Sequence, residues 1–171
     1  ISINYVKSLI GFYAETWVVE NIYLPNQEQR KCHIFSGNDP SELITRLITK
    51  IEDGEKTFIL TDGQKHKSKW GTRNLEHYIK KRFPHLKILR IDRESVGDPK
   101  HPAYGCIGNL NNILKNYDVV VASPTIETGV SIDIKHFNSV WVISHGVQTV
   151  DAVCQGIERV RDTIPRYIWI N

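Results

Sequence analysis

The sequence predicts an α/β fold: an open, mostly parallel sheet with helices on both faces. Two observations predict it. Short, nearly continuous apolar runs are typical of strands covered on both faces, and segments of helical periodicity separate these runs, which indicates βαβ units. The expected strands are Thr57–Thr61, Lys87–Asp92, Asp118–Ser123, Ser139–Ser144 and Arg166–Ile170, with a sixth candidate at Arg30–Phe35.

The expected helices carry apolar side chains at helical spacing. The first begins at Asp39–Glu42, whose sequence DPSE combines an N-cap, a first-turn proline and a capping-box acid, and Gly54 ends it. The last begins after its cap Thr149 and stops before Pro165. The apolar faces of the later helices are Leu75, Tyr78, Ile79 and Phe83; then Ile107, Leu110, Ile113 and Leu114; then Val150, Val153, Ile157 and Val160. The polar segment Asp92–Tyr104 is expected to form a long surface loop.

Size and composition limit the possible classes of protein. The chain has 171 residues, of which 40% are hydrophobic and 24% charged, which suits one domain with a sizeable core and excludes intrinsic disorder. No apolar stretch reaches the roughly 20 residues of a membrane span. Cys32, Cys106 and Cys154 are too scattered for a disulfide scaffold, so a reducing, cytoplasmic location is expected. They also lack the spacing of metal ligands, and the last two occupy helical patterns as small apolar residues.

The net charge of +3 is concentrated in one stretch, TDGQKHKSKWGTR, at residues 61–73. This basic stretch holds four basic side chains against the single acid Asp62, so it carries the whole excess. Its basic and aromatic members are Lys65, Lys67, Lys69, Trp70 and Arg73. Cations around an aromatic ring suit a sugar–phosphate backbone and an exposed base. The alternative is an ordinary solvated loop.

Polar motifs follow two of the expected strands, where open parallel sheets bind their ligands. Residues 122–133, ASPTIETGVSID, contain four hydroxyl side chains and a glycine that would let donors approach a phosphate closely, although a structural Ser/Thr turn has the same composition. Residues 155–161, QGIERVR, place Gln155 and Arg159 on one helix face. Such an arginine can stabilise a transferring phosphoryl group. The alternative is a pattern of ordinary surface ion pairs, Glu158 with Arg161 or Arg159 with Asp162.

Together, ASPTIETGVSID, a buried strand and QGIERVR resemble motifs V and VI of superfamily 2 helicases. The run TFILTD with the basic stretch falls where motif IV of that superfamily lies, and the resemblance covers residues 30–171. The runs TDGQKHKSKWGTRNLEHYI and HGVQTVDAVCQ are similar to the helicase part of cyanobacterial plasmid replication proteins, in the origin-binding branch.

The resemblance implies a RecA-like fold and the second of two motor lobes, with ATP between the lobes and single-stranded nucleic acid across both. The sequence lacks G-x-x-x-x-G-K-[ST], so ATP and Mg²⁺ would be held mainly by a preceding lobe of the same polypeptide. The chain has no initial Met and no secretory signal, which indicates a segment of a longer protein. Residues 1–29 would be the tether and residues 30–171 the lobe, which alone would not hydrolyse ATP.

The resemblance also implies roles for individual residues. Arg159 would be the arginine finger, Gln155 would contact the γ-phosphate or the attacking water, and Arg161 would be a second cationic contact. Asp133 would accept a hydrogen bond from the ribose or couple the ATP cleft to the nucleic acid. The expected nucleic-acid contacts are Thr61, Lys65, Lys67, Lys69, Trp70, Arg73, Ser123 and Thr125, and Gly129 is expected beside the ATP site. DNA is the expected nucleic acid because of the resemblance to replication proteins.

Two features depart from the family pattern. Glu158 stands where the family commonly has glycine, and a carboxylate there would repel the γ-phosphate unless it points away or pairs with a cation. Arg159 and Arg161 would point about 200° apart on an ideal helix. Both can therefore reach one ATP only if the helix unwinds before Pro165.

Two other functions stay open. A Rossmann-like nucleotide-binding enzyme would need G-x-G-x-x-G after its first strand, and Ser36–Asp39, the nearest candidate, lacks this fingerprint. A non-catalytic nucleic-acid adaptor on the same fold would have no Walker A sequence upstream.

Overall fold

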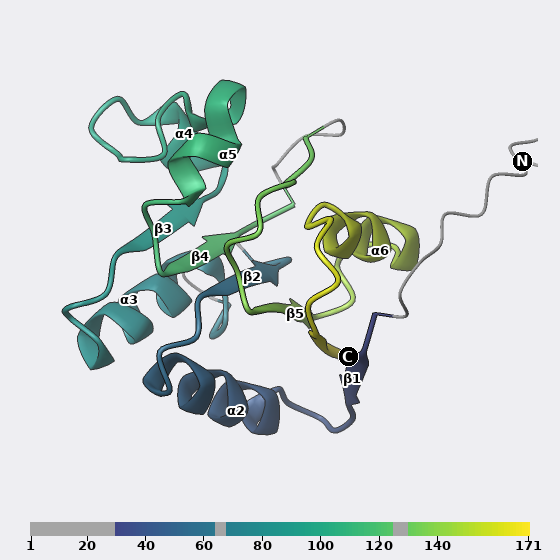
Figure 1. The fold of residues 1–171 in the computed structure, drawn as a ribbon. Coiled ribbons are helices and arrows are strands. Elements are labelled where there is room, and N and C mark those ends of the chain that lie inside the picture. Colours follow the sequence, from purple (N-terminus) through teal and green to yellow (C-terminus); the bar gives the residue numbers. More distant parts are fainter. Residues whose placement is uncertain (1–29, 64–67, 125–129) are drawn as a thin grey trace, which may run out of the picture.

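The computed structural model describes residues 30–63, 68–124 and 130–171. Its centre is a six-stranded, entirely parallel sheet with the strand order β1-β6-β5-β2-β4-β3 (Figure 1). The strands are β1 (Cys32–Phe35), β2 (Thr57–Thr61), β3 (Ile88–Ile91), β4 (Val119–Ala122), β5 (Ser139–Ser144) and β6 (Arg166–Ile170). All six predicted strands are thus confirmed, and three of them are shorter by one or two residues at their ends.

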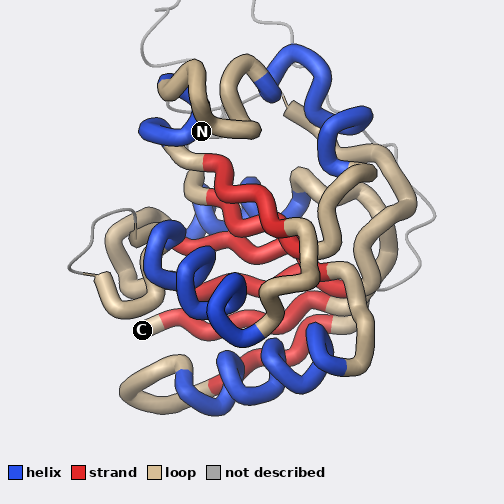
Figure 2. The backbone as a smooth tube through the Cα atoms, turned by 90° about the vertical axis from the view of Figure 1, so that its left-hand side faces the viewer, coloured by secondary structure: helices blue, strands red, loops and turns tan. Residues whose placement is uncertain are grey.

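Helices cover both faces of this sheet, as Figure 2 shows. They are α2 (Ser41–Glu52), α3 (Thr72–Arg82), α4 (Arg93–Gly97), the 3₁₀ helix η1 (Cys106–Asn109), α5 (Leu110–Leu114) and α6 (Val150–Glu158). α2 and α3 pack on one face, and η1, α5 and α6 pack on the other. Successive side chains of β2 enter the two cores in turn: Phe58 and Leu60 face α6, whereas Ile59 faces α2 and α3. This two-sided burial explains the continuous apolar runs.

The sequence predicted the end of α2 correctly but not the hydrogen bonds at its start. Asp39 lies outside the helix, and its carboxylate accepts a hydrogen bond from the backbone N–H of Ser41 at 3.0 Å rather than forming the expected capping box. Gly54 does end the helix, with φ of +83°, a value that favours glycine. The backbone N–H of Glu55 then donates to the carbonyl of Lys50, which completes a Schellman motif.

The prediction of a surface loop at Asp92–Tyr104 was wrong at both ends of that segment. Asp92 caps α4, because its carboxylate accepts a hydrogen bond from the backbone N–H of Ser95 at 2.8 Å. In return, the backbone N–H of Asp92 donates to the hydroxyl of Ser95, also at 2.8 Å. Ser95 and Ala103 are fully buried. The expected third helix is also divided, because it begins as η1 before continuing as α5. Tyr78, expected in the core, is 40% exposed.

The last helix is shorter than predicted, because α6 ends at Glu158. Val160 does not continue the apolar face of the helix but forms an isolated parallel bridge with Ile132. The backbone N–H of Ile132 donates to the carbonyl of Arg159 at 2.8 Å, and the N–H of Arg161 donates to the carbonyl of Ile132 at 3.0 Å. Arg161 therefore lies beyond the end of α6. The angle of about 200° expected between Arg159 and Arg161 on one ideal helix does not apply to them.

The topology opens a crevice at the carboxyl edge of the sheet. After β2 the chain crosses to α3 on one face, whereas after the neighbouring β5 it crosses to α6 on the other (Figure 1). The two connections diverge, and in open α/β sheets such a divergence leaves the crevice in which ligands bind.

Candidate functional site

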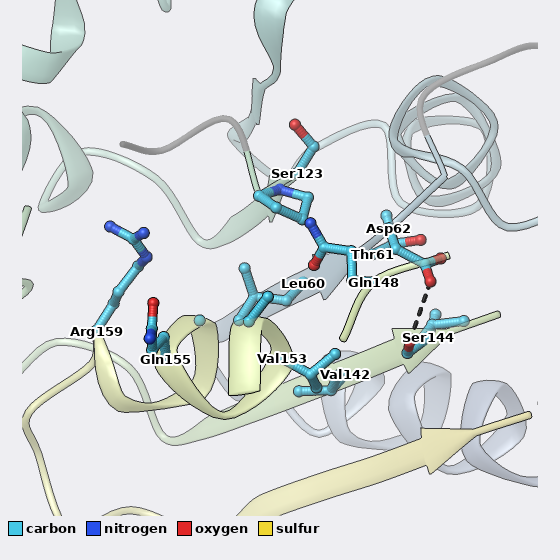
Figure 3. A pocket seen from close by; sticks show the side chains of 14 residues that line it. Leu60, Thr61, Asp62, Ser123, Val142, Ser144, Gln148, Val153, Gln155 and Arg159 are labelled. Atoms are coloured by element: carbon cyan, nitrogen blue, oxygen red, sulfur yellow. Dashed lines mark hydrogen bonds between the residues drawn. The ribbon is translucent and has the colours of Figure 1, made fainter. Parts of the chain in front are cut away.

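A cavity of about 400 Å³ occupies this crevice, between the carboxyl ends of β2, β4 and β5 and the inner side of α6. In Figure 3 the apolar side chains of its wall lie between polar groups at the two ends of the cavity. The polar side chains that line it are Thr61, Asp62, Ser123, Ser144, Gln148, Gln155 and Arg159. A mostly apolar concavity with a few convergent polar groups is the usual form of a small-molecule site.

Gln155 and Arg159 lie together at one end of the cavity (Figure 3). Both come from α6, and their four-residue spacing brings them to the same wall, as the sequence predicted. Arg159 is half-buried, and burial lowers the pKa of its guanidinium, which nevertheless stays protonated at neutral pH. A cation shielded from water attracts an anion more strongly than a solvated one does. This end of the cavity is therefore suited to an anionic group.

Asp62 lies at the opposite end of the cavity (Figure 3). It was not identified as a functional residue from the sequence. Its side chain is 2% exposed. The carboxylate accepts from the Ser144 hydroxyl at 3.0 Å, from His145 N–H at 2.7 Å and from Val147 N–H at 3.3 Å, and it pairs with His145 Nδ1 at 3.1 Å. The signal that could have found it is its position directly after β2, where ligand-binding loops begin.

The described part of the basic stretch folds back onto the end of β2. The buried hydroxyl of Thr61 donates to the carbonyl of Trp70 at 2.9 Å, so Thr61 acts as an anchor for the loop as well as a cavity wall. Trp70 is half-buried against the core and meets Tyr78 edge-on at a centroid distance of 6.0 Å. Lys69 is exposed, with its ammonium 5.1 Å from the centre of the Trp70 ring. Lys65 and Lys67 lie outside the described residues.

Arg73 is half-buried at the start of α3, where it forms an ion pair with Glu94. Part of its charge is therefore compensated within the domain, which weakens it as a candidate contact for nucleic acid. The nucleic-acid candidate Ser123 is fully buried at the end of β4 and lines the cavity. Two further candidates, Thr125 and Gly129, lie outside the described residues.

Glu158, the departure from the family pattern, pairs with a cation, which is one of the two alternatives that the sequence left open. It forms an ion pair with Arg30, whose guanidinium also donates to the carbonyl of Arg161 at 3.1 Å. The carboxylate is thereby occupied by a basic partner, and its repulsion of an anion near Arg159 is reduced.

Arg161 and Asp133 belong to a second polar group, and neither lines the cavity. Arg161 Nε donates to the Ser131 hydroxyl at 3.4 Å, and that hydroxyl donates to the carboxylate of Asp133 at 2.5 Å. Asn111 of α5 holds the same segment from the other side, because its amide accepts from Asp133 N–H and donates to the Ser131 carbonyl, both at 3.0 Å. The structure thus brings Asp133 near Arg161, and it brings Gln155 near Arg159.

A buried ionic cluster supports the start of α3. Asp92 lies 3.1 Å from Arg90 Nη1 and accepts a hydrogen bond of 2.6 Å from Thr72, the first residue of α3. Burial raises the pKa of the Asp92 carboxyl, but the hydrogen bonds from Thr72 and Ser95 and the charge of Arg90 outweigh burial, so the pKa lies below its ordinary value.

This lowered pKa predicts an acid-dependent loss of stability. Because the folded pKa lies below the unfolded value of about 3.9, Asp92 stabilises the fold above about pH 4 and stops doing so as the pH falls through the lower folded pKa. We expect Asp92→Asn to cost about 2 kcal/mol of unfolding free energy at pH 7, because it removes the charge that Thr72 and Ser95 N–H donate to, whereas Arg90 keeps its ion pair with Glu76 at 3.1 Å. Urea unfolding from pH 7 to pH 2 should show a flatter acid limb for D92N than for the wild type. Asp98→Asn, which alters an exposed carboxylate bonded to Lys100 N–H, is the control; equal acid limbs for D92N and wild type would contradict the assignment.

The described residues were also compared with what a metal site or a membrane span requires. Within residues 30–63, 68–124 and 130–171, no group of three His, Cys, Asp or Glu side chains is arranged to hold a metal ion. Every helix in those ranges is too short or too polar to cross a membrane. Cys106 is buried as an apolar residue, as predicted, whereas Cys32 and Cys154 are exposed.

Sequence comparisons connect the chain with two much longer proteins, and no family model matches it. An uncharacterized protein of Picosynechococcus sp. is 50% identical over 173 residues, which cover 99% of this chain and 17% of that protein. A protein of Acanthamoeba polyphaga mimivirus named "putative replication origin-binding protein" is 26% identical over 159 residues, which cover 91% of this chain and 18% of that protein. The chain spans less than a fifth of the length of either relative.

Among solved structures, domain 2 of the DEAD-box helicase Mss116p, bound to an RNA duplex, has a TM-score of 0.55 with this chain. The match covers 83% of this chain and 54% of that one at 14% sequence identity. The chain has the fold of a RecA-like helicase domain. In this RecA-like domain the carboxyl edge of the sheet carries the cavity with Gln155 and Arg159, the described end of the basic stretch, and the buried Asp62.

Proposed function

We propose that the chain is the second RecA-like lobe of an ATP-dependent superfamily 2 helicase or translocase that acts in DNA replication. The observation that carries the proposal is the cavity at the carboxyl edge of the sheet, with Gln155 and Arg159 at one end. The helicase-domain fold and the replication origin-binding relative support it. The resemblance of the motifs to cyanobacterial plasmid replication proteins supports DNA as the nucleic acid.

In this proposal Arg159 is the arginine finger and Gln155 contacts the γ-phosphate or orients the attacking water. The half-buried guanidinium fits this role, because a fixed cation stabilises the charge that develops on a transferring phosphoryl group. The phosphate would bind at the end of the cavity that holds Gln155 and Arg159, because the carboxylate of Asp62 would repel it at the other end. Arg161 would supply a second cation, and Asp133 would bind the ribose or couple the two sites.

ATP and Mg²⁺ would be held mainly by a preceding lobe of the same polypeptide. Asp62 is the one carboxylate among the described residues that line the cavity, and its oxygens already receive donors from Ser144, His145 and Val147. This wall therefore fits the phosphate better than the metal. Residues 1–29 would connect the two lobes, with the domain beginning at residue 30.

The nucleic-acid track would follow the basic stretch and motif V. The exposed ammonium of Lys69 beside Trp70 supports a contact with the sugar–phosphate backbone. Thr61 and Ser123 are buried, so they would act mainly by positioning the loops that follow β2 and β4. Lys65, Lys67, Arg73, Thr125 and Gly129 stay candidates on the sequence pattern.

Neutralising the lysines tests the nucleic-acid half of the proposal. With Lys65, Lys67 and Lys69 all changed to Gln, the slope of log K against log salt for single-stranded DNA should fall by up to about 2, since each lost phosphate contact removes roughly 0.7. Fluorescence anisotropy with a labelled oligo(dT) at several salt concentrations measures this slope. The control changes the exposed Lys81, Lys115 and Lys135 instead. An unchanged slope in the first variant would mean that the basic stretch is merely solvated.

A further inference from the structure

We propose that Asp62 is a positioning residue that couples the nucleic-acid loop to the helix carrying Gln155 and Arg159. This inference rests on the proposed function. It gives a role to Asp62, which ends the run TFILTD but received no role from the motif pattern. Asp62 lies between Thr61, which anchors the described end of the basic stretch, and Gly63, whose carbonyl accepts from Thr72 N–H at 2.9 Å. The described residues that follow the loop, Trp70 and Thr72, are therefore bonded to the residues on both sides of Asp62.

On its other side, Asp62 holds the connection from β5 to α6. Its carboxylate takes donors from Ser144, His145 and Val147, which are the last residue of β5 and two residues of the following loop. Its own N–H donates to the carbonyl of Ile143 at 3.3 Å. The loop leads directly to the cap of α6, where Thr149 accepts from Ala152 N–H. One side chain thus joins two segments that are about eighty residues apart in the sequence, as the spacings of 82 to 85 residues record.

The hydrogen bonding of Asp62 suits a positioning role. The side chain is 2% exposed, and both carboxylate oxygens are engaged by groups of this chain. A buried carboxylate satisfied in this way fixes the relative position of the groups that donate to it. Asparagine has nearly the same shape but replaces one acceptor oxygen with an NH₂ donor. The hydroxyl of Ser144 and the N–H groups of His145 and Val147 all donate to Oδ2, so an Asn whose amide oxygen takes that place could keep all three. Alanine removes both oxygens and leaves these donors without an acceptor.

His145 reinforces the same connection. Its ring lies edge-on to Trp169 at a centroid distance of 5.3 Å, so the imidazole is fixed between β6 and Asp62. His145→Phe keeps a ring against Trp169 and removes only the contact with Asp62. This variant tests the connection without disturbing the backbone donors.

The test uses the complete protein and compares ATP hydrolysis with and without oligo(dT). We expect Asp62→Ala to lower the ratio of stimulated to basal kcat by about tenfold, within the usual range of coupling between sites. His145→Phe should lower it by about twofold to threefold. The control is Asp118→Asn, because Asp118 accepts a backbone N–H from Lys87 at 2.9 Å at the opposite edge of the sheet. D118N should leave the ratio unchanged. A wild-type ratio in both D62A and H145F, with DNA binding intact, overturns the inference.

A second measurement separates this inference from the proposed function and serves if D62A does not fold. In the amide spectrum of chain 1–171, oligo(dT) should shift the signals of Lys69 and of His145 and Val147, and in H145F the last two shifts should shrink. Shifts at Lys69 without any at His145 and Val147 in the wild type overturn the coupling while leaving nucleic-acid binding intact. If oligo(dT) neither binds the chain nor stimulates the complete protein, the proposed function itself fails.

Discussion

Arg159→Ala in the complete protein should lower kcat for ATP hydrolysis by about 10³- to 10⁵-fold, the usual contribution of an arginine finger. The reason is the position of the guanidinium at the α6 end of the cavity, where it is half-buried and lies beside Gln155. No other lysine or arginine among the described residues lines this cavity, so we expect no basic side chain of the described wall to replace it.

Steady-state kinetics with saturating oligo(dT), together with anisotropy for DNA affinity, measure this effect. DNA affinity should change by less than about threefold, because Arg159 is assigned to the nucleotide and not to the strand. Arg159→Lys should recover only a small part of the rate, since lysine keeps the charge but loses the fork of donors. The control Arg82→Ala removes an arginine at the end of α3, far from α6 in the fold. Near-normal turnover in R159A would remove Arg159 from the active site.

The second large effect is expected from Arg166→Met, which should lower the unfolding free energy by about 3 kcal/mol. Arg166 begins β6 and is fully buried. Its guanidinium donates to the carbonyls of Val160 and Asp162, both at 2.7 Å, and to the carbonyl of Ile164. Methionine fills a similar apolar volume, so the cost reports the carbonyls that lose their donor rather than a cavity.

Thermal unfolding of chain 1–171 checks this expectation. A loss of 3 kcal/mol corresponds to a Tm lower by about 6–12 °C for a domain of this size. Arg46→Met, an exposed arginine whose guanidinium lies over the Tyr167 ring, is the control and should shift Tm by no more than about 2 °C. Equal melting of R166M and wild type would show that the segment after α6 is held by other contacts, such as the bridge between Ile132 and Val160.

Much of the fold could be predicted because its signals are local. β2 and β5 are continuous apolar runs, and the structure buries all of their residues. α2 buries Leu43, Ile44, Leu47, Ile48 and Ile51, the face that helical spacing selects. The pairing of Gln155 with Arg159 on one wall follows from the same periodicity.

Long-range contacts explain what the sequence did not reveal. α6 was expected to include Val160, but the backbone after Glu158 pairs with Ile132 and is held by Arg166, and neither partner is adjacent in the sequence. In the sequence, Asp62 is only the single acid of a basic stretch. Its hydrogen bonds with Ser144 and His145 exist only because the fold brings β2 and β5 together. Arg30, which pairs with Glu158, is separated from it by 128 residues.

The sequence alone determined the strands, most of the helices and the class of fold, because apolar periodicity and turn residues act over a few neighbouring positions. Tertiary structure alone decided where α6 ends, which groups face the cavity, and which charges are paired. Those features depend on the order β1-β6-β5-β2-β4-β3, which places the ends of β2, β4 and β5 side by side. Local patterns do not encode which strands become neighbours, and so the chemistry at that edge becomes visible only in the folded chain.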